Sequence, residues 1–247
     1  MTLDAFFREH PRAVLGFSGG VDSAYLLYAA RSAGAEVYPC FVQSAFQPAG
    51  ALAEAQALAA AMGLELAVLE LNPLADENIA ANGPRRCYFC KKAIFSALRD
   101  FAREKGIRDV LDGTNASDDA GDRPGMQALR ELGVLSPLRA CCLAKADVRA
   151  RAREAGLPVW DKPSNSCLAT RVPTGEAITS QALARVDGAE SALHALGFSG
   201  LRARLSGGAL RLELPEGQIP RCVELRAAVR EALAPYGEPI LLDLKGR

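Results

Sequence analysis

The sequence has no excess of charge of either sign, because 29 lysine and arginine residues balance 29 aspartate and glutamate residues in a chain of 247. This balance leaves no overall field that would attract nucleic acid or an anionic membrane. No apolar run is long enough to cross a bilayer, and the first residues lack the basic and apolar regions of a secretory signal. We therefore expect a cytoplasmic protein without a nucleic-acid or membrane partner.

Histidine is scarce, and cysteine is present in an odd number. The two histidines, His10 and His194, stand near no motif, so histidine catalysis is not expected. Seven cysteines in a reducing compartment do not fit a disulfide framework. Cys40 and Cys222 stand in apolar segments and are expected in the core. For the other cysteines, metal, cluster or thiol chemistry is favoured.

Short apolar segments alternate with helical ones in the first half of the chain. Strands are expected at 13–17, 37–42, 64–71 and 107–111. Helices are expected at about 23–33, at 51–62 and from Pro84 onward, and Gly34 is suited to the position after the first helix. This alternation predicts an α/β fold with a doubly wound, mostly parallel sheet.

The last third of the chain has a different pattern. After a proline-containing stretch at 160–175, Thr179 is placed to cap a helix. Two short strands around Gly207 and Gly208, another helix and a final strand at 239–244 follow. This order suits a small α+β domain. We place the boundary near Pro173, with a first domain at 1–172 and a second at 173–247.

A glycine loop separates the first expected strand from the first expected helix. It consists of Ser18, Gly19, Gly20, Val21, Asp22 and Ser23. Glycines let the backbone approach a ligand closely, and the first N–H groups of a helix, with its dipole, favour negative charge. An aspartate in an anion site is explained by a divalent cation between its carboxylate and phosphates.

The loop therefore predicts ATP with Mg²⁺. It is not a Walker A loop, since no Lys-Ser or Lys-Thr pair follows the glycines. It resembles the PP-loop of the N-type ATP pyrophosphatases. The alternative is an ordinary Gly-Gly turn capped by Asp22 and Ser23.

A polar turn, Asp112-Gly113-Thr114-Asn115, follows the strand expected at 107–111. Ligands of open α/β sheets bind at the carboxyl ends of the strands. We therefore expect Asp112 and Asn115 to contact a nucleotide, and their alternative role is to stabilise the turn itself.

Three cysteines form a candidate site. Cys87 and Cys90 lie three residues apart after Pro84, so both sulfurs are expected on one face of a first helical turn. Cys167 lies in the proline-containing stretch near Arg171, which is suited to hold an anion beside it. A CxxC pattern can bind zinc, cycle as a dithiol or merely pack. Three thiolates without an evident fourth suit a [4Fe-4S] cluster with one open iron.

Together and in this order, the motifs resemble the LarE family of ATP-dependent sulfur transferases, which build the nickel-pincer cofactor of lactate racemase. The match covers nearly the whole chain. It rests on Gly16 and Phe17 with the glycine loop, Arg86-Cys87-Tyr88-Phe89-Cys90-Lys91, Asp112 to Asn115, Asp118 with Arg123-Pro124-Gly125, Ser136-Pro137-Leu138, and Lys162 to Arg171. The resemblance implies an adenine nucleotide alpha hydrolase-like, PP-loop fold.

The resemblance also implies a two-step reaction. A carboxylate of pyridinium-3,5-biscarboxylic acid mononucleotide attacks the α-phosphate of ATP, and pyrophosphate leaves. Sulfur then attacks the acyl-adenylate to give a thiocarboxylate. Asp22 would hold Mg²⁺ in the first step, and Cys167 resembles the residue at the sulfur-delivery position.

The family delivers sulfur in two ways. In one, the loop cysteine gives up its own sulfur and becomes dehydroalanine. In the other, three cysteines hold a [4Fe-4S] cluster. Cys87 and Cys90 together with Cys167 favour the second way for this sequence, and an isolated Cys167 would serve the first.

The resemblance implies further roles in the smaller domain. Arg202 and Arg204 alternate along an expected strand and therefore point the same way. By resemblance they bind the phosphate of the substrate, with Glu190 near a metal ion. The alternative is a solvated strand face. The family forms a homohexamer, a dimer of trimers.

Other functions remain open at this point. A PP-loop enzyme that thiolates tRNA should show a basic surface or an added RNA-binding domain. An amide-forming synthetase, such as NAD synthetase or asparagine synthetase, would not need Cys167 or the CxxC pair. A non-catalytic adenine-nucleotide sensor would have no evident use for Asp22 or the cysteines.

Overall fold

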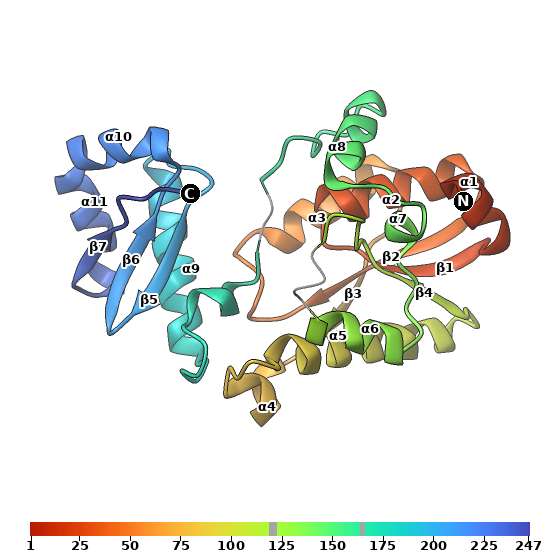
Figure 1. Cartoon of the computed structure of the whole chain (residues 1–247), viewed down its shortest axis with the longest axis horizontal. Coiled ribbons are helices and arrows are strands. Elements are labelled where there is room, and N and C mark those ends of the chain that lie inside the picture. Colours follow the sequence, from red (N-terminus) through yellow and green to blue (C-terminus); the bar gives the residue numbers. More distant parts are fainter. Residues whose placement is uncertain (119–122, 164–165) are drawn as a thin grey trace. The chain divides into compact units, whose positions relative to one another are not determined.

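The computed structural model describes residues 1–118, 123–163 and 166–247. The chain forms two compact units, each with its own sheet (Figure 1). The first unit comprises 1–44, 50–73 and 87–165, and the second comprises 45–49, 74–86 and 166–247. Two short early segments therefore belong to the second unit. The domain boundary near Pro173 stays a prediction.

Within the described residues, the sheet of the first unit has four parallel strands in the order β3-β2-β1-β4. These are β1 (Arg12–Gly16), β2 (Glu36–Gln43), β3 (Ala67–Glu70) and β4 (Asp109–Leu111). The predicted parallel α/β sheet is confirmed, although β3 and β4 are shorter than the apolar runs suggested. The strand order changes direction between β1 and β4, and such a switch point is where open α/β sheets bind ligands.

Helices cover both faces of this sheet (Figure 1). Because side chains alternate along a strand, Leu15 packs on one face of β1 and Val14 on the other. The Leu15 face carries α1 (Leu3–Glu9), α2 (Val21–Ser32), α3 (Ala51–Ala61), α7 (Pro137–Ala140) and α8 (Lys145–Glu154). The Val14 face carries α5 (Arg86–Glu104) and α6 (Arg123–Glu131).

The ends of α2 show how the local sequence fixes the helix. Gly20 is the N-cap residue, so the helix begins two residues before the predicted start at Ser23. At the other end, Gly34 has a φ of 75° and occupies the predicted left-handed position. The earlier start places Asp22 in the first turn of the helix.

The second unit contains β5 (Arg202–Ser206), β6 (Ala209–Glu213) and β7 (Ile240–Leu242), in the order β5-β6-β7. β5 and β6 are antiparallel, whereas β6 and β7 are parallel. Thr179 caps α9 as predicted, since its hydroxyl accepts the Ala182 N–H at 3.0 Å. The α-helices of this unit are α4 (Glu77–Ala80), α9 (Ser180–Ala195), α10 (Ile219–Glu224) and α11 (Arg226–Leu233). Its 3₁₀ turns are η2 (Leu168–Arg171), η3 (Glu216–Gln218) and η4 (Ala234–Tyr236). The 3₁₀ turn η1 (Pro73–Ala75) begins in the first unit and ends in the second.

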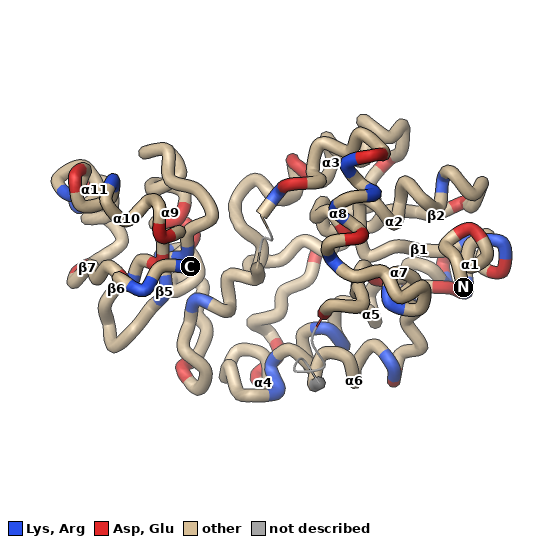
Figure 2. The backbone as a smooth tube through the Cα atoms, turned by 45° about the horizontal axis from the view of Figure 1, so that its top comes forward, with Lys and Arg blue, Asp and Glu red and all other residues tan. Residues whose placement is uncertain are grey.

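The core of the second unit forms where its helices pack on its sheet. Leu193 of α9, Leu212 of β6 and Leu233 of α11 are all buried in one cluster. Basic and acidic residues are interspersed along both units (Figure 2). Of the helices in the described part of the chain, none has both the length and the apolar character to span a membrane.

Candidate active site

The glycine loop follows β1 and continues into the first turn of α2, at the carboxyl end of the sheet. Gly19 has a φ of 69°, and a Cβ atom there would lie 3.2 Å from the Ala55 backbone, so only glycine fits without strain. The Ser18 hydroxyl accepts the Gly20 N–H at 3.4 Å and lies 3.4 Å from the Ser23 hydroxyl. Both hydroxyls therefore lie at the entry to α2.

The start of α2 is suited to hold an anion. Its N-cap residue, Gly20, provides no side-chain hydrogen bond within the described part of the chain. The first N–H groups of a helix lack partners inside the helix, and the dipole makes that end positive. The Ser18 hydroxyl lies at the same end, and the Ser23 hydroxyl donates to the Gly20 carbonyl at 3.1 Å.

Asp22 connects the loop with two other segments. Its Oδ1 atom accepts a hydrogen bond from the Asn115 amide at 3.3 Å, and its Oδ2 atom pairs with Lys145 Nζ. The side chain of Asp22 is 22% exposed, so its carboxylate is accessible from outside. The structure thus brings Asp22 and Asn115 together, although 93 positions separate them in the sequence.

The turn after β4 packs directly against the loop. A Cβ atom at Gly113 would lie 3.3 Å from Ser23 N and 3.4 Å from Asp22 Cβ, which explains the glycine. The Asn115 backbone N–H donates to Asp118 Oδ2 at 2.8 Å, and the side-chain Oδ1 atom of Asn115 accepts the Ser117 N–H at 2.8 Å. These bonds fix Asn115 so that its amide group faces Asp22.

Asp112 is a buried carboxylate at this edge of the sheet. Burial raises its pKa, while the nearby hydroxyls of Ser136 and Thr114 act in the opposite direction. Thr114 donates to Oδ2, and Oδ1 lacks a hydrogen-bond partner among the described residues. An unsatisfied buried oxygen beside the loop fits a residue that receives a ligand donor.

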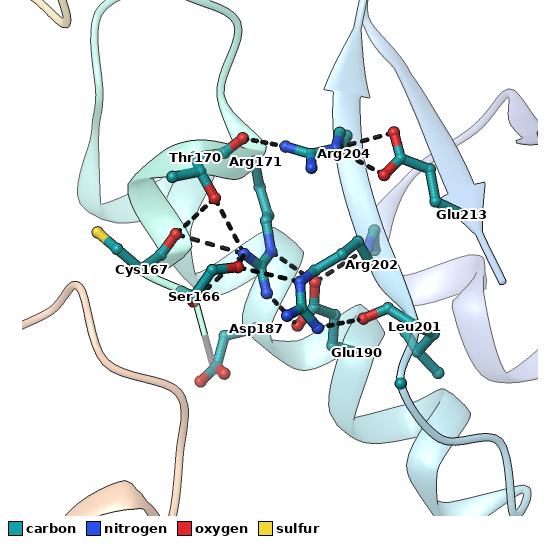
Figure 3. A network of polar contacts seen from close by, with 12 residues as sticks. Ser166, Cys167, Thr170, Arg171, Asp187, Glu190, Leu201, Arg202, Arg204 and Glu213 are labelled. Atoms are coloured by element: carbon teal, nitrogen blue, oxygen red, sulfur yellow. Dashed lines mark hydrogen bonds and ion pairs between the residues drawn. The ribbon is translucent and has the colours of Figure 1, made fainter. Parts of the chain in front are cut away.

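In the second unit, Arg171 forms a buried ion pair with Glu190 (Figure 3). Nε lies 2.7 Å from Oε1, and Nη2 lies 3.0 Å from Oε2. Oε1 also accepts the Ala203 N–H of β5 at 3.0 Å. The Arg171 and Glu190 side chains are 1% and 8% exposed.

The remaining donor group of Arg171 holds the turn that carries Cys167. Nη1 donates to Ser166 Oγ at 2.6 Å, to Thr170 Oγ1 at 3.0 Å and to the Cys167 carbonyl at 3.3 Å. The Cys167 sulfur points away from these groups (Figure 3). Arg171 thus contacts the backbone of Cys167. Roles of Arg171 toward an anion and of Glu190 toward a metal stay predictions.

Arg202 and Arg204 both extend from β5 toward this turn (Figure 3). Arg202 Nε donates to Ser166 Oγ at 3.1 Å. Arg204 donates to the Thr170 carbonyl and lies 2.8 Å from both carboxylate oxygens of Glu213. Burial, and next the positive charge of Arg171, lower the pKa of Arg202 to about 10. Arg204 is 29% exposed, and binding of a phosphate by Arg202 and Arg204 stays a prediction.

The three cysteines of the candidate cluster lie in different units. Cys87 and Cys90 are half-buried in α5 of the first unit, and Cys167 is exposed in the second. The described residues form no group of three or more histidine, cysteine, aspartate or glutamate side chains suited to a metal ion. The cluster stays a prediction. Cys40 and Cys222 are buried as predicted.

Comparison of the sequence with known proteins identifies the family of this chain. The chain is 34% identical to the pyridinium-3,5-bisthiocarboxylic acid mononucleotide synthase of Lactiplantibacillus plantarum, over 99% of this chain and 90% of that protein. The chain belongs to the LarE family. No family model matches it.

Two further relatives of this LarE-family chain are uncharacterised proteins. One, from Synechocystis, is 38% identical over 90% of this chain and 83% of its own length. The other, from Methanocaldococcus jannaschii, is 29% identical over 79% of this chain and 75% of its own length.

Sequence reasoning missed two residues of this LarE-family structure. Lys145 follows an alanine at the start of α8 and belongs to none of the recognised motifs. Asn82 is fully buried, and its amide donates to the Pro173 carbonyl at 2.8 Å. Its Oδ1 atom accepts from Arg86, which also donates to the Ala169 carbonyl at 3.0 Å. The sequence Asn-Gly-Pro signals only a turn.

Proposed function

We propose that this LarE-family chain is an ATP-dependent sulfur transferase that converts a carboxylate of pyridinium-3,5-biscarboxylic acid mononucleotide to a thiocarboxylate. The named synthase, similar over 99% of the chain, supports the product class. The observation that carries ATP dependence is the glycine loop with Asp22 at the switch point between β1 and β4. This placement supports a PP-loop fold of the adenine nucleotide alpha hydrolase-like class.

The first step is adenylation of the substrate carboxylate. A carboxylate oxygen attacks the α-phosphorus of ATP, and the bond to the bridging oxygen of pyrophosphate breaks. The N–H groups at the start of α2, with the hydroxyls of Ser18 and Ser23, would bind the departing pyrophosphate. Asp22 would hold the Mg²⁺ that neutralises its charge. Asp112 and Asn115, at the adjacent strand end, would contact the nucleotide.

The second step replaces AMP with sulfur. Cys167 is exposed, and its sulfur points away from the arginine network, so it is accessible to an acyl-adenylate. A [4Fe-4S] cluster held by Cys87, Cys90 and Cys167 would supply sulfur at an open iron. The partial exposure of Cys87 and Cys90 on one helical turn fits thiolate ligands. The alternative is sacrificial use of the Cys167 sulfur.

The second unit would bind the substrate. Arg202 and Arg204 would bind its phosphate, because both guanidinium groups face the turn of Cys167. For Arg171 to bind an anion, or Glu190 a metal ion, the pair between them would have to open. We also propose a cytoplasmic homohexamer, a dimer of trimers.

The test of this function is Asp22→Ala in an assay with ATP, Mg²⁺ and the biscarboxylate mononucleotide. We expect the variant to release no pyrophosphate, because the loop then lacks its metal ligand. Asp100→Ala is the matched control, since Asp100 is 59% exposed on α5 and forms a solvent-exposed ion pair with Arg103. Pyrophosphate release by Asp22→Ala at the wild-type rate would remove the catalytic assignment.

A further inference from the structure

The cation that pairs with Asp22 comes from outside the glycine loop. Residues 18–23 contain no lysine or arginine, so the loop itself provides no positive side chain to a triphosphate. Lys145, the first residue of α8, places its ammonium group on Asp22 Oδ2. A Walker A loop supplies its phosphate-binding lysine from its own sequence. In this chain the tertiary structure brings a lysine from α8 to the glycine loop.

The backbone around Lys145 is held in place from two sides. The Lys145 N–H donates to Ser117 Oγ at 2.9 Å, in the segment that follows β4. The Ala144 N–H donates to Asp147 at 2.9 Å, and α8 packs against α2. The start of α8 is therefore fixed beside the start of α2, while the Lys145 side chain remains 30% exposed.

We propose that Lys145 is a ligand of the β- and γ-phosphates of ATP, a role that rests on the proposed function and extends it to a residue outside the known motifs. A Mg²⁺ ion bound at Asp22 Oδ2 would repel the ammonium group that contacts the same oxygen. The ammonium group would then leave Asp22 and would be available to the phosphates of a bound nucleotide. The flexible four-carbon stem of lysine permits this short movement.

The exchange keeps charges paired at each stage. Lys145 neutralises Asp22 in the ion pair, and Asp22 would be neutralised by Mg²⁺ in the nucleotide complex. The freed ammonium group then faces a triphosphate, where hydrogen bonds between charged groups are strong. After the carboxylate attack, Lys145 stays with the departing pyrophosphate and stabilises the charge that develops on it.

Calorimetric titration of the full-length protein with Mg·ATP and, separately, with AMP tests this role. We expect Lys145→Ala to weaken Mg·ATP binding roughly 10- to 100-fold, the effect of one charge-assisted hydrogen bond. Its affinity for AMP should stay at the wild-type value, because AMP lacks the outer two phosphates. Lys145→Arg should retain most of the affinity for Mg·ATP, since a guanidinium group also binds phosphate.

Two controls separate binding from folding. Arg12→Ala removes an ion pair at the opposite, amino-terminal end of β1 and should leave both affinities unchanged. Lys145→Gln keeps most of the stem and an amide donor for Asp22, so it serves if Lys145→Ala does not fold. We expect it to lose affinity for Mg·ATP in the same way.

The outcomes distinguish the two proposals. Wild-type protein that binds Mg·ATP, with Lys145→Ala or Lys145→Gln binding it equally well, would overturn the role of Lys145 alone. Equal losses for Mg·ATP and AMP would also overturn it, since they indicate a merely structural ion pair. Wild-type protein that binds no Mg·ATP would overturn the proposed function, and the role of Lys145 with it.

Discussion

Glu190→Ala removes the carboxylate that pairs with Arg171, and we expect it to lower the free energy of unfolding of the second unit by about 3–5 kcal/mol. The magnitude follows from burial. The two side chains are 1% and 8% exposed, and two contacts of 2.7 and 3.0 Å join them. The substitution leaves the guanidinium group buried without its counter-ion.

A second contribution comes from the backbone. Glu190 Oε1 also accepts the Ala203 N–H, which loses its acceptor in the alanine variant. Glu190→Gln keeps one oxygen for this N–H and should therefore be less destabilising than Glu190→Ala.

Urea denaturation measures these changes through the midpoint and slope of the unfolding transition. The control is Arg230→Ala, which breaks a solvent-exposed pair with Glu238 in the same unit. The side chains of that pair are 72% and 58% exposed and lie 3.4 Å apart. Its loss should change the free energy of unfolding by less than about 1 kcal/mol. If Glu190→Ala were no more destabilising than this control, the buried pair would not hold the Cys167 turn as described.

Two further predictions concern the cysteines and Asp112. Protein reconstituted anaerobically with iron and sulfide should absorb broadly near about 400 nm, and Cys90→Ser should lose this band. Intact mass should then be unchanged by turnover, whereas a loss of about 34 Da would indicate sacrificial use of Cys167. Because burial raises the pKa of Asp112, the folded wild-type protein should lose stability as the pH rises above about 3.9 and through the folded value. Asp112→Asn cannot ionise, so its stability relative to wild type should increase over that range in urea titrations; a constant difference would contradict the buried charge.

The sequence was most informative where local patterns decide the structure. The run from Ala13 to Phe17 predicts a strand, and β1 covers most of it, because buried parallel strands are continuously apolar. Gly34 and Thr179 mark helix ends through their own backbone and side-chain chemistry, and both occupy the predicted positions. The strand expected at 64–71 is shorter, since hydrophobicity does not indicate where pairing with β2 begins.

The sequence by itself determined the glycine loop, the polar turn after β4 and the family resemblance, because each depends on residues adjacent in the chain. The tertiary structure alone decided which distant side chains meet them. It brings Lys145 and Asn115 to Asp22, and pairs Arg171 with Glu190. Such pairs depend on how helices pack against a sheet and on the burial of charge, and neither leaves a pattern in local sequence.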